Sequence, residues 1–231
     1  MKSVFKLILL ENKKFRTSKY IKGVIIANIA LFSLIMLVCY TEDPEGIFQL
    51  TSQNIVEMIN VFVNDVFLIF SASMLARYII GEYSNKTINI MFTYPIQRKK
   101  IIYAKLLLVC LFITITIFLS NIFIMGSFYL VNLFTQVFVL EITLGYIILV
   151  LLKSLLYAVA YSLISCISLL FGMMKKSQIS TIVSSVIIVS IIGSSNNGFS
   201  LSSILAIPII LASIGFAIIV YTFRNIERVD I

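Results

Sequence analysis

The sequence predicts an all-α integral membrane protein with six transmembrane helices and with both termini in the cytoplasm. Two observations support this class. First, 60% of the 231 residues are hydrophobic and only 12% are charged, whereas soluble proteins average about 45–50% and about 25%. Second, the basic residues cluster between long apolar runs. Lipid can cover the apolar surface that a soluble core of this size has no room to bury.

Six apolar runs are the candidate spans, because about 20 helical residues cross the hydrocarbon core. The fifth run is short for a full span, so we expect it to be tilted, broken or only partly inserted. The third and fourth runs are long enough to tilt or to extend beyond the bilayer. Within a single transmembrane domain of residues 1–231, the runs are about 21–40, 55–80, 101–131, 143–171, 179–192 and 204–221.

The distribution of charge predicts the orientation. If the six helices alternate, all but one of the 18 basic residues fall on the same side of the membrane. The loops expected on the other side, residues 41–54, 132–142 and 193–203, contain no Lys or Arg. Since Lys and Arg collect in cytoplasmic loops, both termini are expected in the cytoplasm. The abundance of Ile, Lys and Asn is typical of an AT-rich bacterial genome, so the expected location is a bacterial plasma membrane.

The first 20 residues alternate apolar and basic side chains. This pattern suits an amphipathic helix that lies in the inner headgroup region. A plain basic retention signal is the alternative.

Several function classes are excluded by residue types. The chain has no His, and its cysteines, Cys39, Cys110 and Cys166, lie in apolar runs without CxxC spacing, so neither a metal site nor a disulfide framework is expected. The segment Gly193–Gly198 resembles a phosphate-binding loop but lacks the required Lys. The chain is therefore not expected to be an enzyme or to bind a cofactor. A nucleic-acid partner is not expected either, because no basic face exists outside the clusters.

The segment between the second and third spans, residues 77–100, is too polar to cross the membrane and too apolar for a flexible linker. Ile88, Met91 and Phe92 share one face of a short helix. Glu82 and Lys86 lie at i and i+4, a spacing that supports the start of that helix.

Pro95 ends this short helix, because the residue before a proline is biased away from the α conformation. Arg98, Lys99 and Lys100 then anchor the third span at the inner interface. A short cytoplasmic helix with an apolar edge is suited to docking on a soluble partner. An ordinary amphipathic connection is the alternative.

At these residues the chain resembles the permease subunits of ABC-2 type transporters, and most closely those of bacitracin- and lantibiotic-resistance exporters and related peptide exporters. The resemblance covers the whole chain in topology, and its sharp motif is the stretch 82–100. It implies a coupling element that seats in a groove of an ABC ATPase, which would bind ATP and Mg. The coupling residues would be Glu82, Lys86, Thr87, Ile88, Met91, Phe92, Pro95 and Arg98.

The resemblance also implies an assembly and a cargo. Two permeases, as a homodimer or with a paralogue, would join two ATPases and export an amphipathic or hydrophobic substrate, such as a peptide antibiotic or toxin. One departure concerns the re-entrant hairpin that such permeases carry before the last span. Because the loop 193–203 is short, this hairpin is placed only loosely, around residues 179–208.

Two other function classes predict different sequence features. An ATP-independent secondary carrier or channel predicts an internal inverted repeat, and the halves 1–115 and 116–231 show no convincing one. A membrane enzyme or signalling partner would need clustered His, Asp or Glu at membrane depth, which the sequence lacks.

Polar residues in the second span suggest a substrate pathway. Glu57, Asn60, Asn64 and Ser71 follow three- to four-residue steps along one helix face, with Asp65 beside them. Carboxylates within a membrane normally face a cavity or a partner helix. Equally, the stretch from Glu57 to Asp65 belongs above the membrane if the helix extends beyond it.

The fourth span carries a matching face with Lys153, Tyr157 and Tyr161. The simpler interpretation of Lys153 is a side chain that snorkels to the outer interface. The alternative pairs it with Glu57, Asp65 or Glu141 to gate an outward exit.

Overall fold

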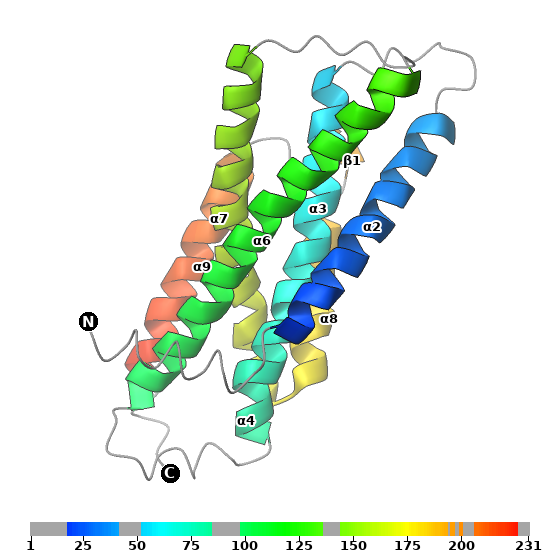
Figure 1. The fold of residues 1–231 in the computed structure, drawn as a ribbon. Coiled ribbons are helices and arrows are strands. Elements are labelled where there is room, and N and C mark those ends of the chain that lie inside the picture. The colour runs from blue at the N-terminus through cyan, green and yellow to red at the C-terminus, as the bar shows by residue number, and fades with distance from the viewer. Residues whose placement is uncertain are drawn as a thin grey trace.

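The computed structural model describes residues 18–41, 52–84, 98–135, 144–193, 195–196, 199–200 and 206–225. Nearly all of these residues are helical (Figure 1). The elements are α2 (Ser18–Thr41), α3 (Ser52–Leu75), the π-helical turn η1 (Ala76–Ile80), α4 (Gly81–Ser84), α6 (Arg98–Thr135), α7 (Leu144–Lys175), α8 (Gln178–Ile192), β1 (Ser195–Asn196), β2 (Phe199–Ser200) and α9 (Ala206–Asn225).

Four helical segments are long and apolar enough to cross a membrane: Tyr20–Cys39, Asn54–Ile80, Ile101–Phe134 and Gly145–Lys175. They confirm the predicted helical membrane class and coincide with the first four predicted spans. The apolar segments Gln178–Ile192 and Ala206–Val220 are shorter. At 1.5 Å per residue, α8 is about 22 Å long, against a hydrocarbon core of about 30 Å. The count of six full spans therefore stays a prediction.

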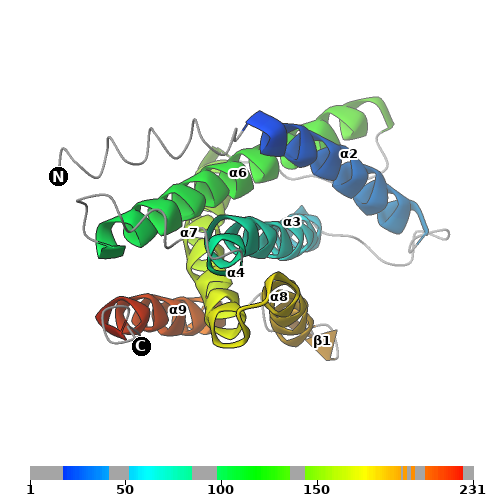
Figure 2. The same cartoon turned by 90° about the horizontal axis from the view of Figure 1, so that it is seen from below.

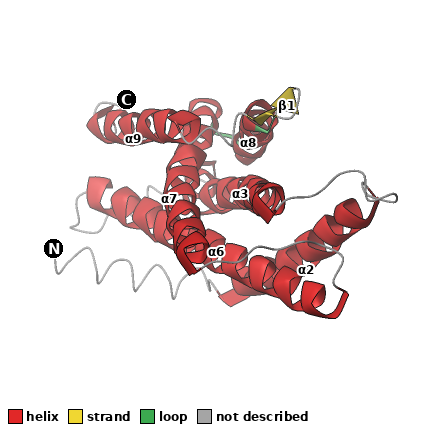
Figure 3. Cartoon of the chain, turned by 90° about the horizontal axis from the view of Figure 1, so that it is seen from above, coloured by secondary structure: helices red, strands yellow, loops and turns green. Residues whose placement is uncertain are grey.

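Helix α7 occupies the middle of the bundle. Seen along the helices, it is surrounded by α3, α6, α8 and α9 (Figures 2 and 3). Helix α2 lies at the periphery, where it crosses α6 and leaves most of its surface uncovered (Figure 2). Its outward side chains, such as Ile25, Ile26 and Leu37, are exposed, as expected of a helix that faces lipid. Asn28 Nδ2 of α2 donates a 3.0 Å hydrogen bond to Ser120 Oγ of α6.

Small residues allow the central helices to approach one another closely. A side chain on Gly215 of α9 would overlap the backbone carbonyl of Leu163 in α7, and one on Gly172 of α7 would overlap Thr181 of α8. Ser71 Oγ of α3 donates a 2.8 Å hydrogen bond to Ser165 Oγ of α7. Small residues and hydroxyl pairs of this kind typically join transmembrane helices.

Consecutive long helices run in opposite directions, so the basic residues come together at one end (Figure 1). Among the residues whose side chains are described, those at this end are Lys22, Arg77, Lys105, Lys175 and Lys176. Lys153 is the exception. It lies 22 residues before Lys175, which is about 33 Å along a helix. This polarity matches the charge pattern of the sequence, while the assignment of the basic end to the cytoplasm stays a prediction.

The structure differs from the predicted elements at several helix ends and in two connections. Helix α2 already begins at Ser18, inside the predicted interfacial helix 1–20, whose residues 1–17 lie outside the described part of the chain. Helix α6 extends beyond 101–131 in both directions, and α7 continues to Lys175. These extensions follow because helical hydrogen bonding does not stop where the apolar run stops.

The two remaining differences concern the connections. No break separates the second span from α4, because α3, η1 and α4 form one continuous helical segment. After α8, β1 and β2 form a short antiparallel ladder that pairs Ser195 with Ser200, where an all-α chain was expected. The intervening sequence contains Asn-Gly at 197–198, a strong hairpin signal.

Candidate functional site

A polar pocket lies between α3 and α7. It has a volume of about 270 Å³. Six of the seven residues predicted to line a substrate pathway surround it, and Asp65 is the one that does not. The full lining is Val56, Glu57, Asn60, Val61, Asn64, Tyr146, Leu149, Val150, Lys153, Tyr157 and Tyr161.

Helical periodicity explains how these residues meet. Glu57, Asn60 and Asn64 are three and four residues apart, so they lie on one face of α3. Lys153 and Tyr157 share a face of α7 for the same reason, because they are four residues apart. The structure brings the two faces opposite each other, since α3 packs directly on α7.

Exposure falls from the rim of the pocket to its floor. Glu57 and Lys153 are exposed, whereas Asn60 is 8%, Asn64 is 2% and Tyr161 is 0% exposed. The charged groups therefore mark the rim, and the amides and the phenol mark the floor. Neither Glu57 nor Lys153 forms an ion pair with another residue in the described part of the chain.

The floor contains polar atoms without protein partners. Oδ1 of Asn60, Oδ1 of Asn64 and the hydroxyl of Tyr161 are buried and make no hydrogen bond to any residue in the described part of the chain. The other amide atom of Asn60, Nδ2, donates a 3.0 Å hydrogen bond to the carbonyl oxygen of Val56. Buried polar groups are normally hydrogen-bonded, and an unmet one costs about 1–3 kcal/mol. These atoms are therefore suited to contact water or a ligand.

Asp65 faces a different neighbour. A Cβ added to Gly193, at the end of α8, would stand 3.2 Å from Asp65 Oδ2. The Asp65 carboxylate therefore lies next to the C-terminal end of α8.

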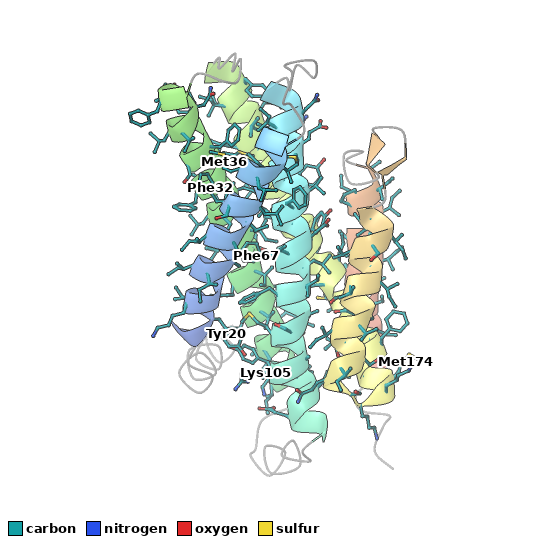
Figure 4. The ribbon with its side chains drawn as sticks, turned by 90° about the vertical axis from the view of Figure 1, so that its right-hand side faces the viewer. Tyr20, Phe32, Met36, Phe67, Lys105 and Met174 are labelled. Carbon is teal, nitrogen blue, oxygen red and sulfur yellow. The ribbon has the colours of Figure 1, made fainter. Side chains whose placement is uncertain are left out.

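A second polar feature lies near the basic end of the bundle. Lys105 of α6 is 2% exposed and forms an ion pair with Glu82 of α4. Its Nζ also donates a 3.4 Å hydrogen bond to the carbonyl oxygen of Tyr78 in η1. Figure 4 shows Lys105 at the lower end of the bundle, beside the end of α3. A buried ammonium must be paired, so this contact joins α6 to the end of the α3 segment.

The sequence analysis did not single out Lys105. Glu82 was expected to pair with Lys86, which lies outside the described residues, and the structure supplies Lys105 as its partner. The available signal was a Lys within an apolar helix, several residues beyond the basic cluster that opens that helix. An ionisable residue there is a candidate functional group with a partner to be named.

The tyrosine at 78 belongs to a buried aromatic group at this end of the bundle. Its ring packs edge-on against Tyr20 of α2, with 5.6 Å between centroids, and Tyr20 also contacts Phe70 of α3 at 6.0 Å. Through Tyr78, the π-helical turn η1 therefore contacts both Tyr20 of α2 and Lys105 of α6. Turns of this kind often occur at functional sites.

The other predicted coupling residues are not tested. Lys86, Thr87, Ile88, Met91, Phe92 and Pro95 lie outside the described residues, and for Arg98 only the backbone position, at the start of α6, is described. Their role stays a prediction.

Comparison with known proteins identifies the family. The model of the ABC-2 family transporter protein matches residues 7–193. The chain belongs to the ABC-2 transporter family. It is also 38% identical over 226 residues to the uncharacterized protein YcbO of Bacillus subtilis (strain 168), covering 97% of this chain and 99% of that protein. No solved structure matches the chain significantly.

Family membership confirms the broad functional prediction. An ABC-2 protein is a multi-pass membrane component of an ABC transporter, it is not the catalytic subunit, and its family implies an ABC ATPase as partner. The narrower resemblance to bacitracin- and lantibiotic-resistance permeases stays a prediction.

Proposed function

We propose that this chain is the permease subunit of an ABC exporter in a bacterial plasma membrane, with six spans and cytoplasmic termini. Two copies of the permease, or one copy and a paralogue, assemble with two ATPases that bind ATP and Mg. The observation that carries the proposal is the family match together with the ion pair between Glu82 and Lys105. This pair connects Glu82, at the start of the predicted coupling segment, to the buried Lys105 of α6.

The ion pair suggests how motion passes from the ATPase to the spans. The predicted coupling segment, about residues 82–98, runs from Glu82 in α4 to the start of α6 at Arg98. A displacement of this segment pulls on α3 through η1 and on α6 through Lys105. Because α3 and α6 both pack on α7, the central helix receives both movements, and the polar pocket between α3 and α7 changes shape.

The proposed cargo is an amphipathic or hydrophobic molecule, such as a peptide antibiotic or toxin, moved out of the cell or out of the membrane. Resistance or immunity to such a peptide would be the biological role. The cargo rests on the resemblance to peptide exporters. A polar pocket at the end of the bundle opposite the basic end is consistent with an outward exit.

Affinity purification of the chain from its native cell in mild detergent, with mass spectrometry of the co-purified proteins, tests the proposal. We expect a stoichiometric ABC ATPase. Arg98→Ala should reduce its recovery, because the predicted coupling element loses the cation three residues after Pro95. Lys175→Ala is the matched control, since Lys175 is an exposed basic residue at the same end.

Absence of an ATPase from a folded, monodisperse preparation would overturn the permease proposal. A function as an ATP-independent carrier or channel would then explain the pocket better. Recovery of the ATPase with both variants would instead refute the role of Arg98 in coupling.

A further inference from the structure

Two cysteine thiols meet between α6 and α7, outside the polar pocket. The sulfur atoms of Cys110 and Cys166 lie 3.8 Å apart. Cys166 is buried and Cys110 is half-buried. The two residues are 56 positions apart on different helices, so the spacing of cysteines along the sequence could not reveal the pair. Thiols this close can share a hydrogen bond or be joined by oxidation.

Hydrogen bonds hold the two thiols only weakly. The acceptor that both can reach is the carbonyl oxygen of Ser162, at 3.9 Å from Cys110 Sγ and 3.7 Å from Cys166 Sγ. The hydroxyl of Ser165 donates to the same oxygen at 2.7 Å. A carbonyl oxygen has only two lone pairs, and a thiol is a weak donor. Removal of both thiol protons would therefore cost little hydrogen bonding.

A disulfide between these cysteines requires a small movement. An S–S bond is about 2.05 Å long, so sulfur atoms that are 3.8 Å apart must approach by about 1.8 Å. A change of side-chain rotamer at one cysteine redirects its sulfur atom on this scale. Cys110 lies about 18 Å along α6 from its start at Arg98, and Cys166 lies about 14 Å before the end of α7 at Lys175. A disulfide suits this depth within the spans, because it carries no charge and no hydrogen-bond donor.

A metal ion fits the pair less well. Metals bind the thiolate form of cysteine, so a monovalent soft cation on two thiolates would leave a net negative charge at membrane depth, where charges are costly. The nearest third donor is a carbonyl oxygen, a poor ligand for the soft cations that thiolates select. In the part of the chain that the structure describes, no three or more His, Cys, Asp or Glu residues are grouped to hold a metal ion.

We propose that Cys110 and Cys166 form a redox-active pair, which a hydroperoxide dissolved in the membrane oxidises to a disulfide that joins α6 to α7. The sulfur of the half-buried Cys110 attacks the terminal oxygen of the hydroperoxide, the O–O bond breaks, and an alcohol leaves with the thiol proton. The sulfur of Cys166 then attacks the resulting sulfenic acid, forms the S–S bond and releases water. Two thiols and one hydroperoxide thus give one disulfide, one alcohol and one water, and the two electrons lost by sulfur reduce the peroxide.

The bridge would fix α6 against α7 at this depth. Helix α7 is the central helix of the bundle, and α6 carries Lys105, which is paired with Glu82 of α4. A covalent link prevents the two helices from sliding or separating. Formation of the bridge does not depend on the proposed function. Its consequence for transport does, because α6 could then no longer move relative to α7 when the predicted coupling segment is displaced.

Thiol counting by intact-protein mass spectrometry tests the proposal. The full chain in lipid bilayers is treated with cumene hydroperoxide, denatured and alkylated with N-ethylmaleimide. The untreated chain has three cysteines and should take up three maleimides. The treated chain should take up one, at Cys39, and reduction with dithiothreitol before alkylation should restore three. The oxidised chain should also melt at a higher temperature than the reduced chain, because a disulfide restricts the unfolded chain.

Variants identify the residues that are bridged. Neither Cys110→Ser nor Cys166→Ser should lose a pair of thiols or gain melting temperature on treatment, whereas Cys39→Ser should still lose two thiols. Cys110→Ser/Thr114→Cys is the matched control. It keeps three cysteines and places the thiol at another half-buried position, one helical turn or about 5.4 Å further along α6, so it should take up three maleimides. If Cys166→Ser does not fold, Cys166→Ala replaces it.

Three maleimides on the treated parent chain would overturn the proposal. Loss of two thiols by Cys166→Ser, or by the matched control, would overturn it as well. A dimer on a non-reducing gel that Cys166→Ser still forms would assign the oxidation to a contact of Cys110 with a second copy. An unchanged melting temperature after the bridge forms would refute the fixing of α6 against α7. None of these outcomes depends on whether an ATPase binds the chain, so they are distinct from failure of the proposed function.

Discussion

At the scale of single residues, a change at Lys105 is expected to affect stability more than a change at the described residues of the basic clusters. The cluster residues whose side chains are described are mostly exposed, and an exposed charge contributes little to stability. Lys105 is 2% exposed and is paired with Glu82, whose side chain is 12% exposed. Loss of Lys105 would remove this ammonium from the Glu82 carboxylate.

Lys105→Met should therefore destabilise the protein strongly. Removing one partner of a buried ion pair costs about 3–5 kcal/mol, whereas replacing both partners by neutral groups is often tolerated. We expect Lys105→Met to lower the melting temperature in detergent, and Lys105→Met/Glu82→Gln to recover much of that loss. Fluorescence-detected size-exclusion chromatography after heating measures both. A double variant no more stable than Lys105→Met would show that the ion pair does not account for the loss.

The residue scale also shows the limit of sequence reasoning. Spacings of three and four residues were sufficient to place Glu57 with Asn60 on one face of α3 and Lys153 with Tyr157 on one face of α7, because such spacing is a property of a single helix. That these two faces meet depends on the packing of α3 on α7. Spacing could not find the pair of Glu82 with Lys105, since this contact depends on how α4 packs on α6. Asp65 was grouped with the pocket because it is adjacent to Asn64 in sequence, although its side chain lies where α8 ends.

At the scale of elements, close approach of helices depends on glycine. Helix α9 meets α7 where Gly215 faces the Leu163 backbone. Lipid tails are as apolar as the side chains they compete with, so helix contact in a membrane depends on shape and hydrogen bonds. The sequence predicted the helices from their apolar runs, but it did not reveal which glycines are contact points.

Gly215→Ala should force α9 away from α7. The new methyl group would overlap a backbone carbonyl, which cannot move as a flexible side chain can. We expect a lower melting temperature and a larger fraction of aggregated protein in detergent. Gly126→Ala on α6 is the control, because a Cβ there meets nothing within 4 Å. Since Ala is favoured over Gly in a helix by up to about 1 kcal/mol, the control should be as stable as the parent or slightly more so. Equal stability of the two variants would contradict the contact.

At the scale of the whole molecule, the bundle has one basic end and one end where the pocket opens. The predicted coupling segment and the Lys105 pair belong to the first end, and Glu57 and Lys153 belong to the second. Helices α3 and α7 connect them, because each carries pocket residues and then continues to the basic end. This arrangement is what a permease driven from the cytoplasm requires. It requires the basic end to lie in the cytoplasm.

Cysteine labelling in intact cells tests that orientation. Asn54, at the start of α3, and Lys175, at the end of α7, are exposed at opposite ends of the bundle. A membrane-impermeant maleimide should label Asn54→Cys in intact cells and Lys175→Cys only after permeabilisation. The parent chain is the control, because Cys39 and Cys166 are buried and Cys110 is half-buried. Labelling of Lys175→Cys in intact cells would show that the orientation is the reverse of the predicted one. It would put the predicted coupling segment outside the cell, where no ATPase could reach it, and would contradict the positive-inside distribution of the 18 basic residues.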